Sequence, residues 1–230
     1  MNQIPLRLTR VLSYTPESFF IHSGVRELLE NILFSISKED FSCFYIYGGK
    51  YSGKTHIGIL IASFAKDYQV YPYLVSGKEI SSFIEEHSNY NLSDKDLVIF
   101  DSAEQYFNFI TPGESGKFVN FYENLKNNRT KLLIFSSKSI DAFKCDEHIK
   151  SRLLGAAFGK LDFPCESELK KIIQLMGVQR GIKLEENNLE YLDKRLGKSF
   201  ESINEYFERL IYLSENLGLK INKNLLSKAL

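Results

Sequence analysis

Residues 48–55, with the sequence GGKYSGKT, fit the phosphate-binding pattern G-x-x-x-x-G-K-S/T. Glycines let the backbone curl until its N–H groups point at phosphate oxygens, and a helix that follows adds its partial positive charge. We expect the Lys54 ammonium to bridge β- and γ-phosphates and the Thr55 hydroxyl to ligate Mg²⁺. A glycine-rich turn with a solvated lysine is the alternative. The predicted nucleotide-binding residues are Gly48, Gly49, Lys50, Tyr51, Ser52, Gly53, Lys54, Thr55 and His56.

An acidic residue, Asp101, directly follows the apolar run of residues 97–100. A buried strand that ends in an acid delivers a carboxylate to the edge of a sheet, beside the phosphate loop, where it can hold Mg²⁺ through water. A turn aspartate is the alternative. The next residue is Ser102, where P-loop ATPases of this kind usually have a second acid that polarises the attacking water. Glu104 is close in sequence but needs a different backbone path, so we expect weak or no hydrolysis by this chain alone.

Two more polar residues complete a predicted catalytic set with Asp101. Ser136 follows the apolar run 132–135, where a hydroxyl can touch the γ-phosphate or the attacking water; an ordinary turn serine is the alternative. Arg152 precedes an expected strand and is a candidate arginine finger, for a nucleotide held by this chain or by a neighbour. A surface arginine is the alternative there.

The apolar pattern outlines the elements that must position these side chains. Short apolar runs predict five strands, and helical periodicity between them predicts helices on both faces of a parallel α/β sheet. After Pro164 the pattern is helical only. We therefore predict an extended segment over 1–22, a P-loop domain over 23–163 and a small helical lid over 164–230. The expected strands cover 43–47, 71–75, 97–100, 132–135 and 157–163; expected helices include 23–36, 54–66, 114–127, 166–178, 185–196 and 200–217.

Composition excludes several classes of protein. The 230 residues carry 29 basic and 29 acidic side chains, and this zero net charge argues against a strongly basic nucleic-acid-binding module. The three cysteines fit no metal or redox spacing, so we expect reduced thiols and a cytoplasmic protein. No apolar run approaches the ~20 residues that span a bilayer, so no membrane association is expected.

The motifs together resemble the DnaA/Hda family of AAA+ proteins. The run YIYGGKYSGKTH is similar to the family's phosphate loop, LVIFDS to its acidic strand, LLIFSSKSI to its polar sensor strand, and HIKSRLLGAAFGKLDF to its arginine-bearing segment. The resemblance covers essentially the whole chain. It implies a P-loop AAA+ (ASCE) fold with a lid of three or four helices and bound ATP or ADP with Mg²⁺. No segment corresponds to DnaA's DNA-binding domain, so direct DNA binding is not expected.

The resemblance also implies partners. Hda-type members bind the replication sliding clamp through an N-terminal peptide and promote hydrolysis of ATP bound to the initiator DnaA. Here the partner-binding residues that resemble this peptide are Gln3, Ile4, Pro5, Leu6 and Leu8. A glutamine followed by aliphatic side chains suits an apolar groove with a polar rim. An ordinary N-terminal segment is the alternative, and a homo-oligomer remains open.

Two positions depart from the family pattern. Ser102 replaces the second acid, and Glu201 stands where the lid's sensor arginine is expected. A carboxylate that faces phosphates repels them, which favours ADP, weak binding or loss of turnover. Three functions therefore stay open: an Hda-like regulator of replication initiation, an autonomous ATPase of the helicase-loader type, and a nucleotide-binding scaffold with a degenerate hydrolysis site.

Overall fold

The computed structural model describes residues 19–88, 92–110, 115–218 and 221–230. The chain divides into two compact units, one spanning Ile21–Cys165 and the other containing Glu166–Leu230. This division lies two residues after the boundary predicted at 163–164. The clamp-like peptide of residues 3–8 lies outside the described residues, so its role remains a prediction.

The first unit is built on a five-stranded sheet, as predicted, with the order β2-β3-β4-β1-β5 and every pairing parallel. The fifth strand is shorter than the predicted 157–163, because its neighbour β1 ends at Tyr47. The Leu161 N–H still donates to Tyr47 O, but the Asp162 N–H donates to Gly24 O instead. The strands are β1 (Cys43–Tyr47), β2 (Tyr71–Ser76), β3 (Asp96–Asp101), β4 (Lys131–Ser136) and β5 (Ala157–Lys160).

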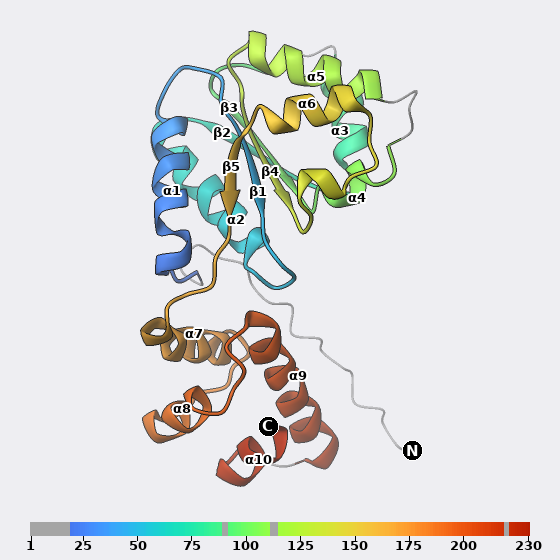
Figure 1. Ribbon diagram of the computed structural model, residues 1–230. Coiled ribbons are helices and arrows are strands. Elements are labelled where there is room, and N and C mark those ends of the chain that lie inside the picture. The colour runs from blue at the N-terminus through green and yellow to red at the C-terminus, as the bar shows by residue number, and fades with distance from the viewer. Residues whose placement is uncertain (1–18, 89–91, 111–114, 219–220) are drawn as a thin grey trace, which may run out of the picture. The chain divides into compact units, whose positions relative to one another are not determined.

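Helices cover both faces of this sheet (Figure 1). One face carries α1 (Ser23–Ile36) and α2 (Lys54–Ala65); the other carries α3 (Ile80–His87), α4 (Glu104–Phe107), α5 (Ser115–Asn127) and α6 (Glu147–Leu154). Short 3₁₀ turns occur at Lys66–Tyr68 and Ile140–Ala142. The sequence did not predict α4 or α6.

Alternate residues of each central strand pack on opposite faces. Tyr45, Phe100 and Ile134 join the core beneath α3–α6, whereas Ile99 and Phe135 pack beneath Gly58 of α2. The three central strands are almost wholly buried, as expected for a parallel sheet covered on both sides.

The edge strands behave differently from the prediction. No strand was expected to be half-exposed, yet β2 and β5 are mostly exposed. Tyr71 and Phe158 keep 67% and 58% of their surface accessible. Both strands lie at the rim of the sheet, where one side has no neighbouring strand.

The second unit is helical, with four helices among its described residues, as the resemblance implied. They are α7 (Glu166–Gln179), α8 (Glu186–Asp193), α9 (Phe200–Leu217) and α10 (Lys223–Ala229). Its core includes Ile173, Leu192 and Phe207. The buried Arg180 donates to Met176 O at 3.0 Å and lies over the Phe207 ring. Among the helices of the described ranges, none is long and apolar enough to cross a bilayer.

Candidate functional site

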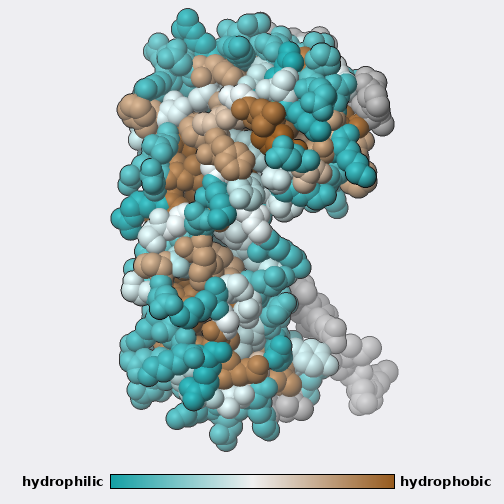
Figure 2. Space-filling model, in the orientation of Figure 1, coloured by the Kyte–Doolittle hydropathy of each residue, from teal (hydrophilic) through white to brown (hydrophobic). Residues whose placement is uncertain are grey.

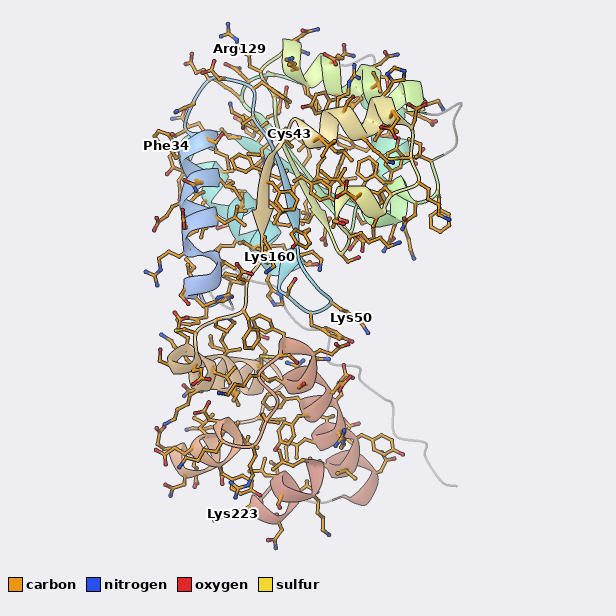
Figure 3. The ribbon with its side chains drawn as sticks, in the orientation of Figure 1. Phe34, Cys43, Lys50, Arg129, Lys160 and Lys223 are labelled. Carbon is orange, nitrogen blue, oxygen red and sulfur yellow. The ribbon has the colours of Figure 1, made fainter. Side chains whose placement is uncertain are left out.

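The carboxyl ends of all the strands meet at one edge of the sheet because every pairing is parallel. Figure 3 shows Lys50 and Lys160 toward this edge and Arg129 toward the opposite one. The segments that follow β1, β3 and β4 therefore converge there. They carry the predicted phosphate loop, Asp101 and Ser136.

The phosphate loop leaves β1 and curls tightly into α2. Gly48 N–H donates to Ser136 O at 3.1 Å, which ties the start of the loop to β4. Gly53 precedes α2 with φ 87°, a left-handed conformation that glycine adopts at little cost. Tyr51 also has a positive φ of 63°. This path brings the first N–H groups of α2, which lack partners within a helix, to the mouth of the loop.

The Lys54 side chain folds back into the loop. Its ammonium donates to Gly48 O at 2.8 Å and Gly49 O at 2.7 Å. Burial lowers the pKa of Lys54, and the carboxylates of Glu104 and, less strongly, Asp101 oppose this shift. The positively charged ammonium is therefore held inside the curl of the loop, in the place predicted for contact with phosphate oxygens.

Thr55 and Asp101 meet as the sequence predicted. Thr55 Oγ1 donates to Asp101 Oδ2 at 2.7 Å, which joins the first turn of α2 to the end of β3. Asp101 Oδ1 is buried and has no hydrogen-bond partner among the described residues. A buried carboxylate oxygen without a partner is costly, so this oxygen fits a cation or its bound water. The hydroxyl and the carboxylate together are the hard oxygen donors that Mg²⁺ prefers.

The remaining predicted loop residues differ in exposure. Gly48 is buried, whereas Gly49, Lys50 and Tyr51 are exposed. The Lys50 side chain lies at the outer bend of the loop (Figure 3) and its ammonium lies 4.7 Å from the centre of the Tyr51 ring. The predicted contacts of these residues with nucleotide stay predictions. His56 is half-buried in the first turn of α2, and its role remains a prediction.

Ser136 lies at the end of β4, where both its hydroxyl and its carbonyl make hydrogen bonds. The residue is fully buried, and its Oγ accepts the Lys138 N–H at 3.1 Å. Tyr45 fixes the same turn by donating its hydroxyl to Lys138 O at 2.6 Å. The hydroxyl thus serves the turn after β4, while the Ser136 carbonyl holds the phosphate loop. The predicted contact of this hydroxyl with the γ-phosphate or the attacking water stays a prediction.

The sequence did not place Glu104 in the site, but its carboxylate lies there. Glu104 Oε2 accepts the Ser137 N–H at 3.0 Å, beside the end of β4. Ser102 makes this possible with φ 56°, a left-handed turn that starts α4 directly after β3. Serine gives no sequence signal for that conformation, which glycine and asparagine favour.

Arg152 lies away from this chain's own phosphate loop. It occupies the last turn of α6, just before β5, and Ala157 of that strand pairs near the start of β1. The loop follows the end of β1, about 13 Å of strand away. Arg152 Nη2 instead pairs with Glu123 Oε1 at 3.0 Å. Of the two predicted roles, contact with a neighbour's nucleotide is the one that this placement favours.

Exposed apolar side chains adjoin Arg152 in the chain. Leu154 and Phe158 are 64% and 58% exposed, and Figure 2 shows a brown hydrophobic patch over the junction of α6 and β5. Contiguous exposed apolar patches mark interaction surfaces, whereas single exposed apolar side chains are ordinary.

Glu201 lies in the first turn of α9 and is exposed. Ser199 caps this helix by accepting the Ser202 N–H, and an acid in the first turn is favoured by the helix dipole. The local structure therefore explains the glutamate without a nucleotide. Its predicted effect on nucleotide binding stays a prediction.

Comparison with known proteins shows relatives in sequence and structure. No protein-family model matches the sequence. An uncharacterised protein of Haemophilus influenzae is 27% identical over 97% of this chain and 94% of its own length.

Solved structures also resemble the chain over most of its length. Domain III of the replication initiation protein DnaA from Thermotoga maritima matches with a TM-score of 0.70 and 18% identity over 94% of this chain and 95% of that one. AMPPCP-bound DnaA from Aquifex aeolicus matches with a TM-score of 0.66 and 18% identity, over 90% of this chain and 68% of that one. A RuvB mutant from Thermotoga maritima reaches 0.66 at 16% identity, over 96% and 72%. The chain has the AAA+ fold that these proteins share, as predicted.

Proposed function

We propose that this chain binds ATP or ADP with Mg²⁺ at residues 48–56 and works as an Hda-like regulator of replication initiation. The observation that carries the nucleotide part is the Thr55–Asp101 hydrogen bond of 2.7 Å beside Asp101 Oδ1, which has no partner among the residues that the structure describes. Lys54 supplies the charge for phosphate, and Thr55 and Asp101 would hold Mg²⁺. The metal would neutralise phosphate charge, while the loop and α2 orient the phosphates. DnaA from Aquifex aeolicus, which shares the fold, binds AMPPCP.

A fluorescent ADP analogue tests the nucleotide part directly. We expect Lys54→Ala to lower its affinity at least tenfold, because the substitution removes the one ammonium inside the loop curl among the described residues. Lys66→Ala is the matched control, since Lys66 is an exposed lysine at the other end of α2. Equal affinities of the two variants would reject the proposed site.

The regulatory part rests on two surfaces. Residues 3–8 resemble a clamp-binding peptide, and Arg152 with the exposed Leu154 and Phe158 offers an arginine to a second AAA+ subunit. An arginine supplied in trans can accelerate phosphoryl transfer strongly. The partners that we propose are the sliding clamp and DnaA, and a homo-oligomer would use the same Arg152 surface.

A pull-down with purified sliding clamp tests the first surface. Gln3→Ala combined with Leu6→Ala should abolish retention, because the polar anchor and an aliphatic anchor are both lost. Thr9→Ala combined with Arg10→Ala, just beyond the peptide, is the control and should be retained. Full retention of the first pair would refute clamp binding through this segment.

One observation favours the alternative of an autonomous ATPase of the helicase-loader type. Glu104 brings a second carboxylate to the site even though position 102 is a serine. ATP turnover by the purified chain, lost with Lys54→Ala, would support this alternative. A bound nucleotide that is never turned over, with clamp and DnaA binding also missing, would instead support the scaffold.

A further inference from the structure

The backbone after β3 takes an unusual path that redirects the chain. Ser102 turns into the left-handed region, while the Ala103 N–H still donates to Phe135 O of β4 at 2.9 Å. Gly77, after β2, leaves room for this turn, since a Cβ there would lie 2.3 Å from Ser102 O. Consequently α4 starts at Glu104, whose side chain returns toward the sheet edge rather than away from it.

A series of three hydrogen bonds leads from Glu104 to the phosphate loop. Its Oε2 accepts the Ser137 N–H at 3.0 Å. The adjacent Ser136 accepts the Gly48 N–H at 3.1 Å, and Lys54 Nζ donates to Gly48 O at 2.8 Å. Glu104 is also the carboxylate that acts most strongly on Lys54, ahead of Asp101. Glu104 is therefore linked to the phosphate loop through the end of β4.

The two acids of the site are held in different ways. Asp101 accepts the Thr55 hydroxyl and lies where Mg²⁺ is expected. Glu104 is half-buried, and among the described residues its carboxylate accepts one hydrogen bond, on Oε2. Its Oε1 thus remains as an acceptor for a water molecule. This arrangement leaves Asp101 to bind the metal and Glu104 to accept a proton.

We propose that Glu104 is the general base for ATP hydrolysis in this chain and takes the place of the acid missing at Ser102. The inference rests on the proposed function, in which the loop at Lys54 holds ATP. Glu104 accepts a proton from a water molecule as the water oxygen bonds to the γ-phosphorus. The bridging P–O bond breaks with its electron pair leaving on ADP, and the proton then passes from Glu104 to the released phosphate.

A purely structural role would be to tie α4 to the turn after β4. Glu104→Gln separates the two roles, because a glutamine carbonyl still accepts the Ser137 N–H but carries no charge and is a poor proton acceptor. Glu85→Gln is the matched control, since Glu85 is an exposed acid on α3 that pairs with Lys117.

The experiment has two readouts on purified wild type, E104Q and E85Q. Calorimetry with AMPPCP and with ADP, both with Mg²⁺, measures whether the carboxylate repels a γ-phosphate. We expect the ratio of AMPPCP to ADP affinity to rise about threefold or more in E104Q. Chromatography of bound nucleotide measures single-turnover conversion of ATP to ADP, which we expect to fall by about 10²-fold or more. E85Q should match wild type in both.

Each failure has its own meaning. An unchanged affinity ratio in E104Q overturns the inference, and so does an unchanged conversion rate or a wild type that never converts bound ATP. In all three cases the wild type still binds nucleotide, so the nucleotide part of the proposed function stands. A wild type that binds neither AMPPCP nor ADP removes the proposed function itself.

Discussion

Gly77→Ala should displace the turn between β3 and α4, although the new side chain would contact no residue that is expected to bind nucleotide. Gly77 follows β2 and is buried against the turn between β3 and α4. An alanine Cβ would lie 2.3 Å from Ser102 O and 2.9 Å from Gln105 Cβ. The nearest obstacle is a backbone carbonyl that accepts the Gln105 N–H at 3.0 Å, so it cannot swing aside as a flexible side chain would.

The magnitude follows from this overlap. The turn must open by about 1 Å to restore ordinary contact, and overpacking of this kind costs ~1–3 kcal/mol. Alanine also restricts the unfolded chain, which offsets ~0.4–1 kcal/mol. The net destabilisation is therefore about 1–2 kcal/mol, or roughly 2–8 °C in melting temperature for a chain of this size. Displacement of the turn should also weaken binding of Mg²⁺-nucleotide, because Asp101 and Glu104 flank it.

Thermal unfolding followed by circular dichroism, with nucleotide titrations on the same samples, measures both effects. Gly58→Ala is the matched control, because its Cβ would meet Phe135 at an ordinary 3.6 Å inside a helix. That variant should be about 0.5–1 kcal/mol more stable than wild type. If Gly77→Ala melts at or above the temperature of Gly58→Ala, the described packing behind the site is wrong.

Two further predictions concern Arg152 and the thiols. Arg152→Ala should change the free energy of unfolding by less than ~1 kcal/mol, because its pair with Glu123 is partly exposed. The variant should nevertheless lose all stimulation of the hydrolysis of DnaA-bound ATP. A stable variant with full stimulation would refute the role in trans. Iodoacetamide should alkylate the exposed Cys165 quickly, whereas Cys43 and Cys145 are buried. Burial raises the pKa of Cys43 to about 12, so its thiolate stays scarce even at pH 9. Mass spectrometry counts the alkylated thiols, and rapid labelling of more than one thiol at pH 9 would contradict the described core.

Much of the architecture was predictable because burial on both faces leaves a strong apolar signal. The runs at 97–100 and 132–135 lie within β3 and β4, and the strand–loop–helix context of residues 48–55 is as predicted. Exposure of β2 and β5 was not predictable, since position in the sheet order depends on pairing across the whole chain. Tyr71 and Phe158 look like core residues in the sequence but lie at the rim.

The site was predictable where adjacency in sequence implies adjacency in space. Lys54 and Thr55 follow the loop directly, and Asp101 ends a buried strand. Glu104 was missed because its placement depends on a left-handed serine and on a close approach to Gly77, neither of which leaves a pattern. The short α6 was also missed, since its eight residues carry only two buried side chains, Ile149 and Leu153.

Calorimetric titration of the wild-type chain with ATP, in Mg²⁺ and then in EDTA, tests most directly whether residues 48–55 and Asp101 hold a metal-bound polyphosphate. We predict clear heat of binding with Mg²⁺, a loss of affinity in EDTA, and a much smaller difference between the two conditions in Asp101→Asn. No heat in either buffer, or an Asp101→Asn variant that depends on Mg²⁺ as strongly as wild type, would contradict the account.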